Sequence, residues 1–306
     1  MALQLGSATP SKLYLGINEV TKAYLGASVA YEVGGGYDSD AQAYFDRVEG
    51  PTGDNQALET PVKDAINAFV VGCKADGIWT AIKSSAILAG ARTLNGALQP
   101  LVGTAPTNFN FVSGDYNRKT GLKGDGSTKY LNSNRKSNID PQNSYHNAVY
   151  YTEQGNVGSG LICAGATTAA ENIYDGGINF FIRNRSSSAA TVAYPAAPGF
   201  IGHSRNNSAN FDVYTNGTLT NQSIASLAPV NADVVLFQRN GAGFSTYRLS
   251  FYSIGESLDL ALLDGRITTL IDHITFYLNT GLDPHNYDID TVRYINAGYA
   301  AGGTLA

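Results

Sequence analysis

The sequence predicts a mainly β fold, an antiparallel sandwich of the jelly-roll type, with a small helical module and an N-terminal β-hairpin anchor. Charged residues make up only 15% of the 306 residues, while glycine (34) and tyrosine (19) are abundant. This composition is typical of a β protein with many turns and a neutral polar surface. Between residues 105 and 281, short apolar runs alternate with Gly/Asn/Ser clusters, as in sandwiches built from many short antiparallel strands.

The N-terminal section, residues 1–36, contains a short repeat. Tyr-Leu-Gly occurs at 14–16 and again at 24–26, each time ending a run of strand-forming residues. An isolated hairpin is only marginally stable in water, so we expect this section to be an intermolecular anchor. The alternative is a hairpin packed on the chain's own sandwich. The glycines at 34–36 indicate a linker. The residues expected to make the assembly contact are Tyr14, Leu15, Tyr24, Leu25, Val29 and Tyr31.

Residues 37–104 are expected to form the helical module. Asp38 can cap a first helix, and Thr60, followed by a proline, marks the start of a second helix that Gly77 ends. A capping hydroxyl, an early proline and a late glycine each suit these positions. A third short helix is expected within 78–87.

Residues 105–281 are expected to form the sandwich. Asn216 and Gly217 lie between two strand-like runs and predict a hairpin turn, because both residue types tolerate positive φ. Tyr247, Leu249 and Phe251 recur at every second position, the pattern of a strand with one wet face. The other runs expected to be strands are FNFV, TKYL, YHNAVYYT, GLICAG, INFFIRN, GFIGHS and VVLFQRN.

A long amphipathic helix is expected at 258–279, and Gly281 can end it. A single helix of this kind must lay its apolar stripe on a sheet or on a neighbouring domain. The stripe consists of Leu263, Ile267, Leu270, Ile271, Ile274 and Leu278.

The last section, 282–306, echoes the start of the helical module. The stretch YDIDTVRYI at 287–295 resembles YDSDAQAYF at 37–45, with Tyr, Asp, Asp and Tyr in register. The section is therefore expected to be a second start of that module; the alternative is a simple C-terminal docking helix.

Cysteine and histidine usage gives no support for a metal or cofactor site, and we expect none. Cys73 and Cys163 both lie in apolar runs, where lone cysteines behave as small hydrophobes. There is no CxxC pair, and the four histidines are scattered. The GDGST stretch at 124–128 is expected to be a plain turn, and Trp79, the only tryptophan, to pack in the core of the helical module.

Charge and hydropathy exclude several classes of protein. A net charge of −5 argues against a nucleic-acid-binding surface. No apolar run is long enough to span a bilayer. The N-terminus lacks the order of basic, apolar and small residues found in a signal peptide, so we expect folding in a cytosol.

Several stretches resemble bacteriophage virion appendage proteins, of the tail-fibre, receptor-binding or capsid-decoration type, that carry a laminin-G or concanavalin-like jelly roll. Residues 12–32 are similar to a short repeat near the ends of phage structural proteins. Residues 38–48 and 61–88 resemble the helical module that precedes such a jelly roll. The stretches that resemble the jelly roll itself are 121–134, 210–219 and 249–282.

This resemblance implies a virion protein that folds in the host cytoplasm and works as a homo-oligomer, a trimer by analogy with fibres. It also implies contact with other virion proteins through residues 1–36. The expected function is a tail fibre or similar appendage that binds host-surface polysaccharide. The alternatives are a capsid decoration or head-fibre protein, or a jelly-roll polysaccharide-degrading enzyme.

Catalytic motifs are missing from the sequence, so we expect a protein that is not an enzyme. A jelly-roll glycosidase needs two carboxylates placed across the sugar, and the few acids of the β section form no alternating run. There is neither a G-x-S-x-G elbow nor a P-loop. The candidate glycan-binding residues are Tyr145, His146, Arg183, Arg185, His203, Arg205 and Asn206.

Overall fold

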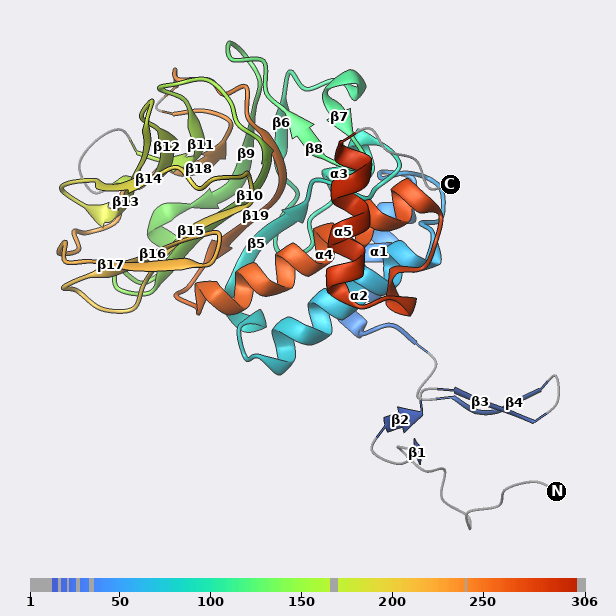
Figure 1. The fold of residues 1–306 in the computed structure, drawn as a ribbon. Coiled ribbons are helices and arrows are strands. Elements are labelled where there is room, and N and C mark those ends of the chain that lie inside the picture. Colours follow the sequence, from blue (N-terminus) through green and yellow to red (C-terminus); the bar gives the residue numbers. More distant parts are fainter. Residues whose placement is uncertain are drawn as a thin grey trace. The chain divides into compact units, whose positions relative to one another are not determined.

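The computed structural model describes residues 36–165, 170–239 and 241–301, together with four strands between residues 13 and 32. Contacts within the chain define two compact units, Met1–Asp38 and Ser39–Ala306. The predicted boundaries at 104 and 281 therefore do not separate compact units, because helices and sandwich share one body (Figure 1).

The N-terminal unit contains two hairpins. Strand β1 (Leu13–Leu15) pairs with β2 (Asn18–Val20), and β3 (Lys22–Leu25) pairs with β4 (Ser28–Glu32), both antiparallel. The Tyr-Leu pair of each repeat copy thus lies in the first strand of a hairpin. The side chains expected to make the assembly contact, and most of the expected glycine linker, lie outside the described residues.

The larger unit is a sandwich of two antiparallel sheets, as the sequence predicts. The first sheet has the order β17-β16-β15-β10-β19-β8-β7, with β5 also paired to β19, and the second has the order β14-β13-β12-β11-β18-β9-β6. The strands of the first sheet are β5 (Ile82–Ile87), β7 (Tyr116–Asn117), β8 (Gly121–Lys123), β10 (Tyr145–Glu153), β15 (Phe200–Arg205), β16 (Phe211–Thr215), β17 (Thr218–Gln222) and β19 (Arg248–Gly255). Those of the second are β6 (Thr107–Phe109), β9 (Tyr130–Lys136), β11 (Gly160–Ala164), β12 (Ala170–Asp175), β13 (Asn179–Ser186), β14 (Ala190–Ala193) and β18 (Asp233–Leu236).

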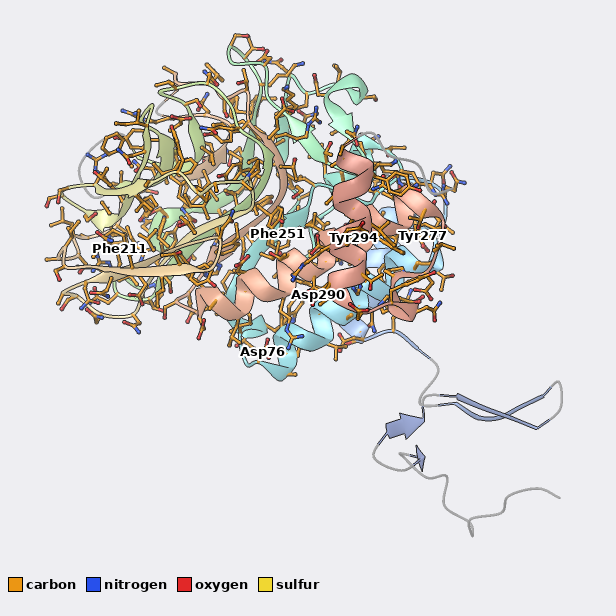
Figure 2. All side chains as sticks on the ribbon, viewed as in Figure 1. Asp76, Phe211, Phe251, Tyr277, Asp290 and Tyr294 are labelled. Atoms are coloured by element: carbon orange, nitrogen blue, oxygen red, sulfur yellow. The ribbon has the colours of Figure 1, made fainter. Side chains whose placement is uncertain are left out.

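Helices form a layer on one side of the sandwich (Figure 1). Phe69 of α2 meets Phe251 of β19 edge-on, with ring centroids 5.6 Å apart, and Asp76 just beyond α2 accepts two hydrogen bonds from Arg266 of α4 at 2.7 and 2.9 Å (Figure 2). The helices are α1 (Ser39–Glu49), α2 (Thr60–Ala75), α3 (Leu94–Ala97), α4 (Leu260–Thr280) and α5 (Ile289–Ala300), with 3₁₀ turns η1 (Trp79–Ala81), η2 (Ser113–Asp115), η3 (Ser137–Ile139) and η4 (Pro284–Asn286).

The long helix and the central hairpin are confirmed. Helix α4 begins after Asp259, whose side chain accepts from two backbone N–H groups, and ends at Gly281 with φ +72°. Five of its six stripe residues are buried, and α4 packs on α2 and on strands β15 and β16. The hairpin joins β16 to β17 through Asn216 and Gly217, both at positive φ.

Three local predictions in the helical module are wrong. The third helix is absent, because the stretch after Trp79 forms a 3₁₀ turn and then strand β5, which pairs with β19. Thr60 is the first residue of α2, and the N-cap is Glu59, without a side-chain cap bond. Trp79 is only half-buried, because its indole N–H reaches outward to the Asp40 carboxylate at 3.0 Å.

The similar stretches 37–45 and 287–295 both begin a helix at the corresponding position, but the two helices pack differently. Asp288 caps α5 by accepting from the Thr291 N–H at 2.9 Å. Tyr44 of α1 is buried at 1% exposure, whereas its counterpart on α5, Tyr294, is 81% exposed (Figure 2). Helix α5 packs on α4, so this section behaves as a docking helix.

Candidate functional site

Five of the seven residues predicted to bind a glycan have no exposed surface. A side chain without exposed surface does not contact a saccharide at the molecular surface, so the prediction is wrong for these five in this conformation. Arg183, in β13 of the second sheet, is half-buried, whereas Asn206, just beyond β15 of the first sheet, is exposed. The five buried residues are Tyr145, His146, Arg185, His203 and Arg205.

Arg185 and Glu171 form a fully buried ion pair between the sheets. The Arg185 Nε donates to Glu171 Oε1 at 2.8 Å, and its guanidinium carbon lies 4.0 Å from the centre of the Tyr145 ring. Burial raises the pKa of Glu171 to about 7, although Arg185 and the Ser137 hydroxyl act in the opposite direction. This pair joins the second sheet to Tyr145 of the first and has a structural role.

Arg205 and the two histidines are also held by the protein itself. The Arg205 guanidinium donates to the backbone oxygens of Asn184, Asn207, Asn210 and Ile224. The His203 ring meets Asn184 across the sandwich at 2.8 Å. His146 bonds to the Glu256 carbonyl at 2.6 Å and the Ser253 hydroxyl at 2.7 Å, and burial lowers its pKa to about 4.

A cleft opens instead between the edge strands of the two sheets, β14 on one side and β16–β17 on the other. Its volume is about 630 Å³. The lining carries hydroxyl, amide, aliphatic and aromatic groups and no charged side chain. It consists of Thr191, Val192, Ala193, Tyr194, Pro195, Ala196, Ala197, Thr215, Asn216, Thr218, Thr220 and Gln222.

Tyr194 is fixed at this cleft by a buried carboxylate. Its hydroxyl donates to Asp175, which is 1% exposed and also accepts from the Tyr247 hydroxyl at 2.7 Å and the Gly177 N–H at 2.7 Å. The Tyr194 ring meets Phe180 edge-on at 4.8 Å. Burial and the Asp175 carboxylate raise the pKa of Tyr194 to about 12, so the ring presents a neutral, rigid phenol to the cleft.

Asn216 shapes the opposite wall. It adopts φ +37° in the β16–β17 turn, and its side-chain amide donates to the Ala197 carbonyl at 2.7 Å. This bond ties the hairpin to the loop that follows Tyr194. A polar, neutral and pre-formed lining of this kind suits a ligand that offers many hydroxyl groups.

A second, smaller cleft of about 350 Å³ lies on the other side of β17, next to the start of α4. Of the seven predicted residues, only Asn206 lines it. Two carboxylates also line this cleft: Asp212, which accepts from the Asn221 amide at 2.7 Å, and Asp259, the cap of α4.

The described part of the chain contains neither a cluster of metal-binding side chains nor a membrane-spanning helix. No group of three or more His, Cys, Asp or Glu side chains there could hold a metal ion. No helix in the described ranges has the length and apolar character needed to cross a bilayer. The GDGST stretch is a turn, in which Asp125 accepts from the N–H groups of Ser127, Thr128 and Lys129.

The cleft could hardly be predicted from the sequence. Tyr194 lies in a YPAAPG stretch without strand alternation, and its partner Asp175 lies two strands away in the sheet order. The one available signal was the Asn-Gly hairpin turn, which forms one wall.

No family model matches the sequence, and no curated protein matches it. Among solved structures, the chain is similar to a GH54 α-L-arabinofuranosidase (6% identity, TM-score 0.38, 50% of this chain and 41% of that one). It is also similar to the binding domain of botulinum neurotoxin DC (17%, 0.33, 48% and 39%). A third match is tailspike protein 2 of the Escherichia coli O157:H7 bacteriophage CAB120 (11%, 0.30, 52% and 25%). Each match spans less than half of the other protein's length, and none carries a function over to this chain.

Proposed function

We propose that this chain is a non-enzymatic glycan-binding protein of a phage virion appendage, and that the cleft beside Tyr194 is its glycan site. The observation that carries the proposal is a cleft of about 630 Å³ lined by hydroxyl, amide and aromatic groups without any charge. Saccharide hydroxyls pair with such neutral donors and acceptors, and the C–H face of a sugar ring packs against an aromatic side chain.

Rigidity favours binding at this position. Asp175 holds Tyr194, and Asn216 ties the opposite hairpin to the loop 195–198. A site whose walls are already fixed loses little conformational entropy when a ligand binds. Several such sites in one homo-oligomer would raise avidity on a repetitive surface polysaccharide without any new contact.

The glycan site is tested on a printed array of bacterial O-antigen and capsular polysaccharides. We expect the intact protein to bind at least one neutral polysaccharide and Ala193→Arg, which fills the cleft with a large charged side chain, to lose that binding. Ala209→Arg adds the same side chain at an exposed loop position outside the cleft lining and should bind as the unchanged protein does. Absence of any array signal, or equal binding by both variants, would refute the cleft as the site.

The virion location rests on the resemblance of residues 12–32, 38–48, 61–88, 121–134, 210–219 and 249–282 to phage appendage proteins. Negative-stain imaging of virions labelled with an antibody against this chain tests it. Label on tail fibres or tail tip supports the appendage role. Label on the capsid favours a decoration or head-fibre protein, and unlabelled virions exclude both.

A further inference from the structure

The outer face of the second sheet carries a compact group of aromatic and cationic side chains. Tyr174 of β12 pairs with Phe181 of β13. Two residues further along the same strands, Asn172 pairs with Arg183. The residues between them along the strands, Ile173 and Ile182, belong to the sandwich core. Because side chains alternate along a strand, these four lie on the side of the sheet opposite the core, where Tyr174, Phe181 and Arg183 are partly exposed and Asn172 is buried. The helical layer covers the first sheet and not this face (Figure 1).

Arg239, just beyond β18, lies over the aromatic row. Its guanidinium carbon is 3.8 Å from the centre of the Tyr174 ring, and the Tyr174 and Phe181 rings stack at 5.4 Å. The strand between β18 and β12 presents Gly160 opposite Tyr174. A Cβ at Gly160 would lie 2.4 Å from the Gln238 carbonyl oxygen, so glycine at this position lets the backbone just before Arg239 approach the strand.

The polar groups of this face lack partners within the protein. The Nε of Arg183 and both side-chain polar atoms of Asn172 are buried without a hydrogen bond. Among the arginines in the described part of the chain, Arg183 and Arg239 are the two whose guanidinium groups make neither a hydrogen bond nor an ion pair. The others donate to carboxylates or backbone carbonyls, as Arg118 and Arg205 do.

Carboxylates do not neutralise these two arginines. Glu171 and Asp175 belong to the same strand as Tyr174 but take part in the interior bonds described above. Asp233, on the neighbouring part of the sheet, pairs with Lys136 at 3.5 Å. A chain of net charge −5 thus presents two uncompensated guanidinium groups on one face.

Apolar side chains border the same group. The hairpin that follows Tyr174 carries Ile178 at 81% exposure, and Val157, at 65% exposure, lies close to Gly177 of that hairpin. Aromatic edges and exposed aliphatic groups beside free guanidinium donors suit a ligand that is partly apolar and carries isolated negative charges.

We propose that this outer face, defined by Tyr174, Phe181, Arg183 and Arg239, binds the carboxylate of an acidic saccharide of the uronate or sialate type. The planar guanidinium groups donate to the carboxylate in pairs, as arginine does most favourably, and Ile178 and Val157 contact the C–H groups of the ring. A nucleic acid fits less well, because its binding needs many phosphate contacts. This site is separate from the cleft beside Tyr194 and takes a ligand of different charge.

Affinity electrophoresis tests the proposal with the full chain in native gels that contain polygalacturonate, colominic acid (a polysialate) or neutral dextran. We expect at least one acidic polysaccharide to retard the migration of the protein, and added salt to weaken this retardation. Dextran, which has no carboxylate, should cause no retardation that depends on this face. Arg239→Gln and Arg183→Gln should each raise the apparent Kd about tenfold, as expected for the loss of one charge-assisted hydrogen bond. Arg293→Gln, which removes the same charge from an arginine paired with Asp272 on the helical side, is the matched control.

Three results would overturn the proposal: no retardation by either acidic polysaccharide, equal retardation of all three variants, or stronger retardation by single-stranded DNA that competes with the saccharide. Ala193→Arg separates this site from the cleft, because it should abolish neutral glycan binding and leave retardation by the acidic polysaccharide intact. Failure at one site is thus distinguishable from failure at the other. Circular dichroism of each variant confirms that the sandwich is retained.

Discussion

At the scale of single residues, the interior of the sandwich contains polar side chains that its sequence suggested for the surface. Arg185, His203 and Arg205 lie in strands flanked by turns, and alternation along a strand separates two faces without indicating which one is buried. The carboxylate, the side-chain amide and the carbonyls that contact these groups come from other strands and from loops. Sequence reasoning could therefore find these residues but not their partners, and it assigned them to the wrong side.

The buried ion pair leads to a first prediction. Arg185→Met leaves Glu171 buried without its charged partner and should cost about 3–5 kcal/mol of unfolding free energy. The double variant Glu171→Leu/Arg185→Met removes both charges and should be much closer to the unchanged protein. Urea unfolding at pH 7.5 measures both. A single variant that is as stable as the double variant would contradict a structural role for the pair.

His146 leads to a prediction about acid stability. Burial lowers its pKa to about 4, below the value of about 6.5 in an unfolded chain, so the folded state binds fewer protons between these two pH values. Stability from this residue is complete above pH 6.5 and falls as the pH drops toward 4, by roughly 3 kcal/mol in total. In thermal melts, the Tm of His146→Gln should decrease less between pH 7 and pH 4.5 than the Tm of the unchanged protein does. Equal losses in the two proteins would rule out this contribution.

At the scale of elements, the prediction succeeded where the hydrophobic periodicity is regular and one face of the element is exposed to solvent. Helix α4 and the β16–β17 hairpin follow from a stripe of apolar residues and from Asn216-Gly217. Strand β5 was missed because nearly all of its residues are buried. A strand covered on both faces has no alternation, and a short apolar run of this kind cannot be distinguished from a helix by pattern alone. Strand β12 with its sequence AENIYD was missed for a similar reason.

Helix α4 offers a matched pair of leucines for a test of its packing. Leu263 is fully buried, whereas its neighbour Leu262 is 39% exposed. Leu263→Ala should cost about 2–5 kcal/mol, because it removes buried methyl groups and leaves a cavity. Leu262→Ala should change stability by about 0.5 kcal/mol or less. Denaturant unfolding of the two variants checks this, and similar values for both would show that α4 does not rest on the sandwich through its predicted stripe.

At the scale of the whole molecule, the two compact units allow a separation of folding from assembly. Removal of residues 1–33 leaves Ser39–Ala306 with its complete core, so the shortened protein should be soluble and melt within a few degrees of the full chain. If residues 1–36 are the anchor, it should no longer join virions. Copy number in purified particles decides the question, and incorporation at the normal level would disprove the anchor.

The absence of catalysis is a second prediction at this scale. Asp212 and Asp259 are the only acids that line either described cleft between or beside the edge strands. Because Asp259 accepts two N–H bonds as the cap of α4, we expect no release of reducing sugar from host polysaccharides. Reproducible release that disappears in Asp212→Asn would identify the second cleft as an active site and overturn the non-enzymatic assignment.

The pairing of β5 with β19 also fixes when the protein can fold during its synthesis. Residues 82–87 leave the ribosome early, but their partner strand ends only at residue 255. Until then the early segment has only the isolated bridge between Ser85 and Val102 and no partner strand. It must avoid non-native pairing, and loop closure over such a distance slows folding. The N-terminal hairpins, by contrast, pair residues adjacent in sequence and can form within moments of their synthesis. An interaction between nascent chains could therefore begin at residues 13–32 before any sandwich exists.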